Sequence, residues 1–286
     1  MVEFLTVILE IFKAILFGIV EGVTEWLPIS STGHLIILNE FVKLDMSEAF
    51  YSMFEVVIQL GAILAVVVLF FPKLNPFSPK KNEQQKASTW QLWFKVIIAA
   101  LPSAVIGLLL DDWMDEHLYN YVVVALALIA YGVAFIYVER RNAGKVPEIK
   151  TVHTIDYRTA LLIGAFQCLA LIPGTSRSGS TILGGILLGV SRGAAAEFSF
   201  FLGIPTMLGA SLLKILKFLT SDVAATGLEV VVLLIGCVVS FVVSLMVIQS
   251  LMAYVRKHNF SLFGLYRIGL GIVVLVYFAV KAIFGA

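Results

Sequence analysis

Seven long apolar segments constrain this chain more than any other feature of its sequence. They span residues 5–20, 56–71, 92–110, 121–138, 198–219, 228–255 and 262–280. A helix that crosses a bilayer needs about 20 predominantly apolar residues. Hydrophobic residues make up 60% of the chain and charged residues 14%, against about 45–50% and about 25% in a soluble domain. The sequence therefore predicts an all-α, polytopic integral membrane protein, and it excludes a soluble globular domain and intrinsic disorder.

Two further apolar stretches are interrupted by polar residues. Residues 28–38 hold PISSTGHLIIL, and residues 161–190 are broken by PGTSRSGS. Non-helical backbone persists at membrane depth only where protein or trapped water satisfies its hydrogen bonds. Both stretches are therefore predicted to be re-entrant or broken helices.

The charges between the apolar segments are sorted by sign. Residues 71–90, 140–158 and 256–257 are basic, whereas DDWMDEH at 111–117 is acidic and lacks lysine and arginine. Basic loops stay on the cytoplasmic side, so we expect the acidic loop and both termini outside. The formal net charge of +1 gives no reason to expect a nucleic-acid partner.

An internal repeat relates the two halves. The segment ILFGIVEGVTEWLPISSTGHLII from Ile15 aligns with LLIGAFQCLALIPGTSRSGSTIL from Leu161, and FEVVIQLGAI aligns with EFSFFLGIP. The expected topology makes the halves inverted, which is the pattern that places a site at the repeat interface. We predict one transmembrane domain over residues 1–286, made of inverted repeats at about 1–141 and 156–286 joined by a basic cytoplasmic loop.

Glu21 and Glu25 lie four residues apart in VEGVTEW. On a helix this spacing places both carboxylates on one face. Because an ionised acid is costly inside a bilayer, the pair must face a cavity, a cation or a proton. A divalent cation with oxygen ligands, Mg²⁺ or Ca²⁺, would supply the counter-charge. The alternative is a helix end at the membrane surface with both glutamates solvated.

The first polar break follows directly. Ser30, Ser31 and Thr32 give three consecutive hydroxyls, and Gly33 permits a close backbone approach or a positive φ. Free N–H groups at the start of the next short helix would bind an anion. His34 can act as a general acid or base. Helix capping by the hydroxyls and a structural core histidine are the alternatives.

The second polar break contributes Thr175, Ser176, Arg177 and Ser178. A guanidinium stays charged and grips phosphate oxygens in a fork. The alternative role for Arg177 is an ion pair with Glu21 or Glu25 that holds the two halves together. That ion pair would also place both polar breaks in one polar core. The two breaks together predict a phosphate site. Further polar residues lie within apolar runs, and we expect each to have a structural role with its hydrogen bonds made inside the protein: Glu55, Gln59, Gln167, Glu197 and Ser199.

The motifs EGVTEWLPISSTGH and PGTSRSG, with FEVVIQLGAILAVV and GVSRGAAAEFSF, resemble the undecaprenyl-diphosphatase family of bacterial membrane enzymes linked to bacitracin resistance. The resemblance covers nearly the whole chain. It implies hydrolysis of a C55 isoprenoid diphosphate to the monophosphate carrier of cell-wall synthesis, with a divalent cation. It also implies interdigitated inverted repeats and a site open to the outer face of the bacterial plasma membrane. A homodimer is a further candidate partnership.

The resemblance suggests roles for the polar residues. Arg177 and hairpin N–H groups would hold the diphosphate, Glu21 and Glu25 would bind a metal or organise protons, and Ser31 would be the nucleophile with His34 as its base or as the acid for the leaving group. A metal-activated water is the rival nucleophile. The rival function is a transporter or flippase of a prenyl-phosphate lipid, because inverted repeats and broken helices are typical of transporters.

Overall fold

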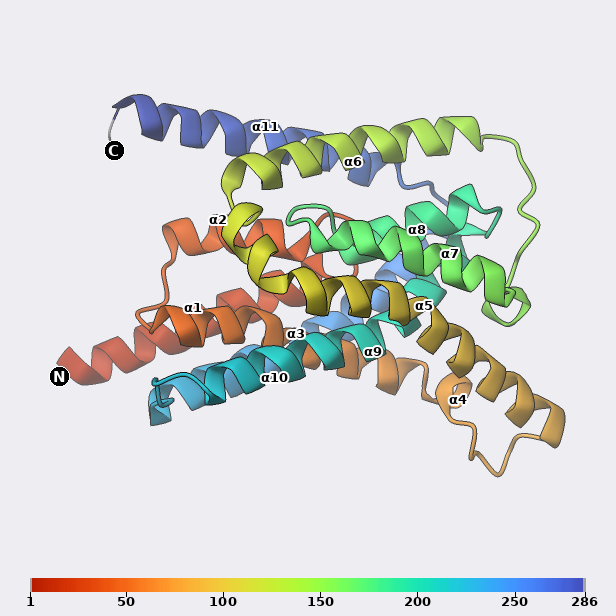
Figure 1. Ribbon diagram of the computed structural model, residues 1–286, viewed down its shortest axis with the longest axis horizontal. Helices are drawn as coiled ribbons and strands as arrows, with labels where there is room; N and C mark the ends of the chain where they lie inside the picture. The colour runs from red at the N-terminus through yellow and green to blue at the C-terminus, as the bar shows by residue number, and fades with distance from the viewer. Residues whose placement is uncertain (1, 285–286) are drawn as a thin grey trace.

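The apolar segments fold as long helices in the computed structural model, which describes residues 2–284 (Figure 1). Within these residues, six helices are long and apolar enough to cross a membrane. They are α3 (Glu48–Leu69), α5 (Glu83–His117), α6 (Tyr121–Arg141), α9 (Arg192–Leu219), α10 (Gly227–Tyr254) and α11 (Ser261–Phe284). The prediction of an all-α, multi-pass membrane protein is therefore confirmed.

Side-chain caps start most of these helices where the sequence changes from polar to apolar. Ser47 caps α3 through the Phe50 N–H, and Asn82 forms a capping box with Gln85 at the start of α5. Thr226 forms a second capping box at α10. Such caps satisfy backbone donors that a helix start leaves unpaired.

Two helical hairpins reach only the middle of the molecule. The first consists of α1 (Val2–Thr24) and α2 (Ser31–Phe41), and the second of α7 (Tyr157–Cys168) and α8 (Arg177–Leu187), with a short 3-10 turn, η2 (Leu169–Leu171), between them. Figure 1 shows α1 and α7 starting at opposite ends of the molecule and turning back near its centre. The two polar breaks are these turns.

Helices from the two halves of the chain pack against each other. The first helix of each hairpin contacts a long helix from the other half: α1 lies on α10, and α7 lies on α5. These contacts are backbone-close, since a Cβ on Gly164 of α7 would lie 2.1 Å from the Ala99 carbonyl oxygen of α5. Small residues permit this approach between membrane helices. The hairpin turns are therefore held by both halves.

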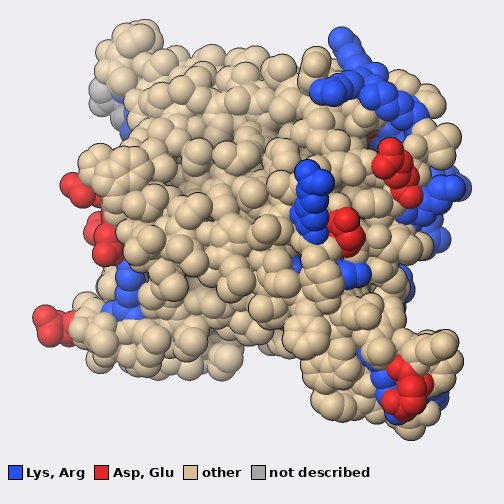
Figure 2. Space-filling view, turned by 45° about the vertical axis from the view of Figure 1, so that its right-hand side comes forward, with Lys and Arg blue, Asp and Glu red and all other residues tan. Residues whose placement is uncertain are grey.

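The charge sorting is visible on the surface. Figure 2 shows most of the visible lysines and arginines gathered toward one end together with some acidic side chains, mainly acidic side chains at the opposite end, and a wide band with almost no charge between them. The basic end holds the short helix α4 (Phe71–Leu74), the 3-10 turn η1 (Val152–Thr154) and the carboxyl end of α6. One expectation is wrong: residues 111–117 are not a loop, because they continue α5 as helix to His117. Both α1 and α11 have their outer ends at the acidic end (Figure 1).

Candidate active site

The two hairpin turns have the same local geometry. Ser30 and Ser176 adopt φ values of 75° and 73°, and they are the non-glycine residues with positive φ in the described chain. Each serine caps the helix that follows: Ser30 Oγ accepts from the Gly33 N–H at 3.2 Å, and Ser176 Oγ accepts from the Gly179 N–H at 3.1 Å. Gly33 is the residue whose type favours a positive φ, but that conformation falls on Ser30. Strain of this kind in non-glycine residues concentrates at functional sites.

Arg177 joins the two turns. Its Nη2 donates to Glu25 Oε1 at 2.7 Å, and its Nη1 donates to the Ser199 carbonyl of α9 at 2.6 Å. The guanidinium also lies over the Trp26 ring, 5.7 Å from its centroid. The ion pair considered as an alternative for Arg177 is therefore present, and it brings both polar breaks into one buried centre.

Glu25 collects donors from both hairpins. Ser31 Oγ donates to Glu25 Oε2 at 2.6 Å, and Ser178 Oγ donates to the Glu25 carbonyl at 3.0 Å. Both the Glu25 and Ser31 side chains are buried. A hydroxyl bonded to a carboxylate at this distance can pass its proton to it. The acceptor that faces Ser31 is thus Glu25, whereas the sequence analysis had considered His34 as its base.

Glu21 is completely buried, and neither of its carboxylate oxygens has a hydrogen-bond partner. Its electrostatic neighbours are Glu25, Arg177 and Glu55. A buried carboxylate without a donor is costly, so it calls for a proton or a cation. Mg²⁺ commonly takes one or two carboxylates and completes its shell with water and phosphate oxygens. Glu21 and Glu25 are the candidate ligands for such a site; both Glu25 oxygens already have donors, and the described residues contain no cluster of three or more acidic, histidine or cysteine ligands.

His34 is held from both ring nitrogens. Its Nδ1 lies 2.7 Å from the Ser30 carbonyl oxygen, and its Nε2 lies 2.8 Å from the Tyr266 hydroxyl of α11. A carbonyl can only accept, so the Nδ1 carries a proton and a neutral ring accepts at Nε2. The two rings also stack. Because Tyr266 is 47% exposed, this pair marks the more open side of an otherwise buried centre.

Arg267 is a site residue that the sequence analysis missed. Its side chain is fully buried, with Nη1 donating to the Pro28 carbonyl at 3.0 Å and Nη2 donating to the Gly174 and Thr175 carbonyls at 2.8 Å each. The guanidinium therefore ties the two turns together from α11. A single arginine within the apolar run 262–280 was the available signal, since an ionisable residue inside a membrane span marks a functional region.

The other predicted residues divide into two groups. Near the centre, Ser176 and Ser178 have their hydroxyls 3.3 Å apart, and Ser199 pairs its hydroxyl with Thr181 at 2.6 Å. Thr32 lies in the first turn of α2. In the second group, Gln167 pairs with Ser103 at 2.6 Å and Glu197 with Lys73 at 2.7 Å. Glu55 accepts from the Tyr119 hydroxyl at 3.3 Å and is also an electrostatic neighbour of Glu21. Gln59 is a half-buried residue of α3.

The fold and this centre define a helical membrane protein whose polar site is built from two broken helices that meet inside the apolar band. Residues 14–273 match the model of the bacitracin resistance protein BacA family, and the chain belongs to that family. A relative from Streptococcus mutans named undecaprenyl-diphosphatase is 60% identical over 96% of this chain and 99% of its own length. Undecaprenyl-diphosphatase 1 of Clostridioides difficile is 59% identical over 95% of this chain and 97% of its own length. The undecaprenyl-diphosphatase of Enterococcus faecalis is 57% identical over 94% of this chain and 97% of its own length.

Proposed function

We propose that the chain is an undecaprenyl-diphosphatase that hydrolyses undecaprenyl diphosphate to undecaprenyl phosphate and inorganic phosphate. The names of relatives that match nearly its whole length support this activity. The observation that carries it is the buried chain of contacts from Arg177 through Glu25 to Ser31, which joins an anion-binding cation to a carboxylate and a hydroxyl. The reaction recycles the lipid carrier of cell-wall synthesis in the bacterial plasma membrane and confers bacitracin resistance.

Substrate binding would use the two turns together. The Arg177 guanidinium offers a planar fork for phosphate oxygens, and the N-termini of α2 and α8 direct their backbone N–H groups and positive dipole ends toward the same centre. Thr175 and Ser176 complete the second turn, and Ser30 and Thr32 the first. One hairpin enters from each end of the molecule (Figure 1); we propose that the site opens on the extracytoplasmic side, as the family resemblance implies.

The chemical step would begin at Ser31. Its Oγ bonds to the terminal phosphorus while the bridging P–O bond breaks, undecaprenyl phosphate leaves with the electron pair, and the Ser31 proton passes to Glu25. Water then attacks the phosphoserine, which releases inorganic phosphate and restores the hydroxyl. His34 accepts at Nε2 in its resting state, so it would take up a proton before serving the leaving group. Glu21 and Glu25 would hold Mg²⁺ or Ca²⁺, which would neutralise phosphate charge.

Direct attack by water, with Glu25 as its base, is the rival for the same site. It requires no hydroxyl at position 31. Full activity in Ser31→Ala would therefore eliminate the phosphoserine route, and trapping a phosphate on Ser31 would establish it.

The activity test uses protein purified in detergent, where no membrane gradient exists. We expect phosphate release from undecaprenyl diphosphate by the unchanged protein, loss of release in Arg177→Ala, and loss on adding a chelator. His34→Ala should also lose activity, with His258→Ala as its control because His258 is exposed in the turn between α10 and α11. A protein that binds the lipid without hydrolysing it would favour a transporter. A homodimer stays a prediction, to be measured as the mass of the detergent complex.

A further inference from the structure

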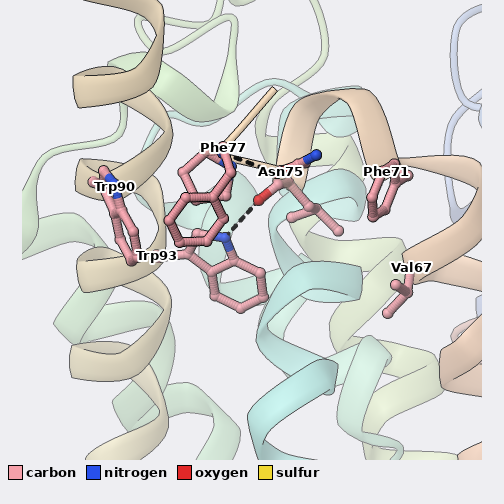
Figure 3. A pocket seen from close by; sticks show the side chains of 8 residues that line it. Val67, Phe71, Asn75, Phe77, Trp90 and Trp93 are labelled. Atoms are coloured by element: carbon pink, nitrogen blue, oxygen red, sulfur yellow. Dashed lines mark hydrogen bonds between the residues drawn. The ribbon is translucent and has the colours of Figure 1, made fainter. Parts of the chain in front are cut away.

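A surface pocket at the basic end lies outside the polar centre. It has a volume of about 370 Å³ and is open on one side. Its walls come from the end of α3, from α4, from the loop that follows α4 and from the first turns of α5; the lining residues are Val67, Phe71, Leu74, Asn75, Pro76, Phe77, Trp90 and Trp93. Figure 3 shows Phe77, Trp90 and Trp93 on one side of it, with Phe71 and Val67 opposite.

Two polar side chains of the pocket wall bond to the wall itself. The Trp93 indole N–H donates to the Leu74 carbonyl at 2.8 Å, and Asn75 Oδ1 accepts from the Phe77 N–H at 2.9 Å. What the pocket presents to a ligand is therefore aromatic and aliphatic surface. The Phe77 side chain is 76% exposed. Exposing an aromatic ring to water costs free energy, whereas contact with hydrocarbon does not. The part of a ligand that enters this pocket is an apolar chain.

A second pocket continues the first and has a different character. Its volume is about 400 Å³, it shares Pro76, Phe77 and Trp90 with the apolar pocket, and it adds Glu83 and Lys86. Around it, residues 71–95 hold five lysines against one glutamate; the lysines are Lys73, Lys80, Lys81, Lys86 and Lys95. Lys73 is paired with Glu197 and Lys86 with Glu83, whereas Lys81 donates to the Lys73 and Asn75 carbonyls and to the Thr89 hydroxyl, none of which cancels its charge. In the lining of the second pocket Lys86 and Glu83 balance each other, so the excess positive charge comes from the other lysines of residues 71–95.

We propose that these two pockets form a binding site for one anionic membrane phospholipid, which we name the α4 lipid site. An acyl chain occupies the pocket between Phe71 and Trp93, and the headgroup phosphate lies beside Lys86, which lines the second pocket, with Lys80 in the loop that follows α4. The site takes a lipid rather than a soluble anion because the lining of the first pocket is mainly apolar. The lipid is anionic rather than zwitterionic because basic residues beside a membrane span attract negative headgroups. Tryptophan at the boundary between charge and hydrocarbon is typical of the membrane interface.

The test measures quenching of tryptophan fluorescence by brominated lipids, with the full-length protein in vesicles. One reporter is Trp113→Phe, which retains Trp90 and Trp93 at the basic end. The matched reporter is the double variant Trp90→Phe/Trp93→Phe, which retains Trp113 near the acidic end. Trp26 is fully buried in both reporters and gives the same background. The vesicles mix brominated phosphatidylglycerol or brominated phosphatidylcholine with the unbrominated form of the other lipid.

The expected result is a several-fold preference for phosphatidylglycerol at the basic-end reporter and none at the acidic-end reporter. A lysine near a membrane surface strengthens anionic binding by up to about fivefold. In the basic-end reporter, Lys80→Gln/Lys86→Gln should therefore remove the preference. Lys145→Gln/Lys257→Gln should retain it, because it removes the same number of lysine charges and neither residue lines the pockets.

A separate variant tests the apolar half. Val67→Phe fills the pocket from the α3 wall, so it should reduce quenching at the basic-end reporter by both lipids and leave the Trp113 reporter unchanged. Equal quenching by the two lipids in the starting protein would overturn the proposal, since the pocket would then be ordinary lipid contact. Absence of quenching would overturn it as well, because protein from the same or another copy would then cover the pocket.

Discussion

Gly203 lies directly behind the Arg177 guanidinium, so a single methyl group can test the position of that side chain. A Cβ at Gly203 would lie 2.7 Å from Arg177 Nη1 and 2.8 Å from both Cζ and Nη2, where ordinary contact begins at 3.4 Å. Gly203→Ala therefore requires the guanidinium to move by about 0.7 Å, the difference between 3.4 and 2.7 Å. The displaced group is the end of a flexible side chain, which can move without a shift of the helices.

The movement should reduce activity much more than stability. It lengthens the 2.7 Å contact with Glu25 and the 2.6 Å contact with the Ser199 carbonyl toward the limit of useful hydrogen bonds, about 3.2 Å. A displacement of about 1 Å in a catalytic arrangement costs about 10²-fold in rate, which is about 2.7 kcal/mol of transition-state stabilisation. We expect kcat/KM for phosphate release to fall by about that factor, with the thermal unfolding midpoint in detergent nearly unchanged.

Gly61 provides the matched control because the internal alignment pairs it with Gly203. A Cβ at Gly61 would lie 2.0 Å from the Cys237 carbonyl oxygen and 2.9 Å from its Cα. That clash is with backbone, so Gly61→Ala must separate α3 from α10, and overpacking typically costs about 1–3 kcal/mol. Gly61→Ala should lower the unfolding midpoint. The reasoning is refuted if Gly203→Ala keeps wild-type kcat/KM, or if it unfolds as early as Gly61→Ala.

Three further predictions concern the side chains around the centre. In Arg267→Lys, the lysine cannot reach all three carbonyls on the two turns. The loss of two charged hydrogen bonds, at about 1.5–3 kcal/mol each, should lower both the unfolding midpoint and the activity. An unchanged midpoint would contradict the role of Arg267 in joining the turns. Tyr266→Phe keeps the ring stacked on His34 but removes one hydrogen bond, so kcat should fall about tenfold at constant KM; Tyr277→Phe on the same helix should not change it, and equal effects would count against the His34 contact. Glu21→Gln should raise the Mg²⁺ concentration needed for half-maximal phosphate release, whereas an unchanged metal requirement would remove Glu21 from the cation site.

The fold class and the meeting of the two polar breaks could be predicted from the sequence because both depend on simple patterns. Apolar length specified the membrane helices, and PISSTGH and PGTSRSGS could be accommodated only as broken helices with satisfied backbone. The acidic residues at 111–117 were predicted to form a loop because charge suggests a membrane boundary. A helix can extend past that boundary into water, and α5 does so.

The contacts inside the centre could not be predicted, because they depend on how distant segments fold onto each other. Arg267 lies 239 residues after Pro28 in the sequence, yet its guanidinium donates to the Pro28 carbonyl. Spacing placed Glu21 and Glu25 on one face but could not show that Glu25 faces Ser31 and Arg177 while Glu21 remains unpaired. Nor could composition show that a strained φ would fall on Ser30 rather than on the neighbouring glycine. The roles of these residues in the reaction stay predictions.

The pairing of Glu21 with Gln167 in the internal alignment has an evolutionary consequence. Both are buried at equivalent places in their hairpins, but the amide of Gln167 is anchored to Ser103, whereas the acid has no such anchor. At this position two copies of one ancestral segment would thus have diverged, one keeping an acid without a hydrogen-bond partner and the other a hydrogen-bonded amide. Restoring symmetry with Gln167→Glu would place an uncompensated buried acid beside Ser103, so this divergence is difficult to reverse in a single step.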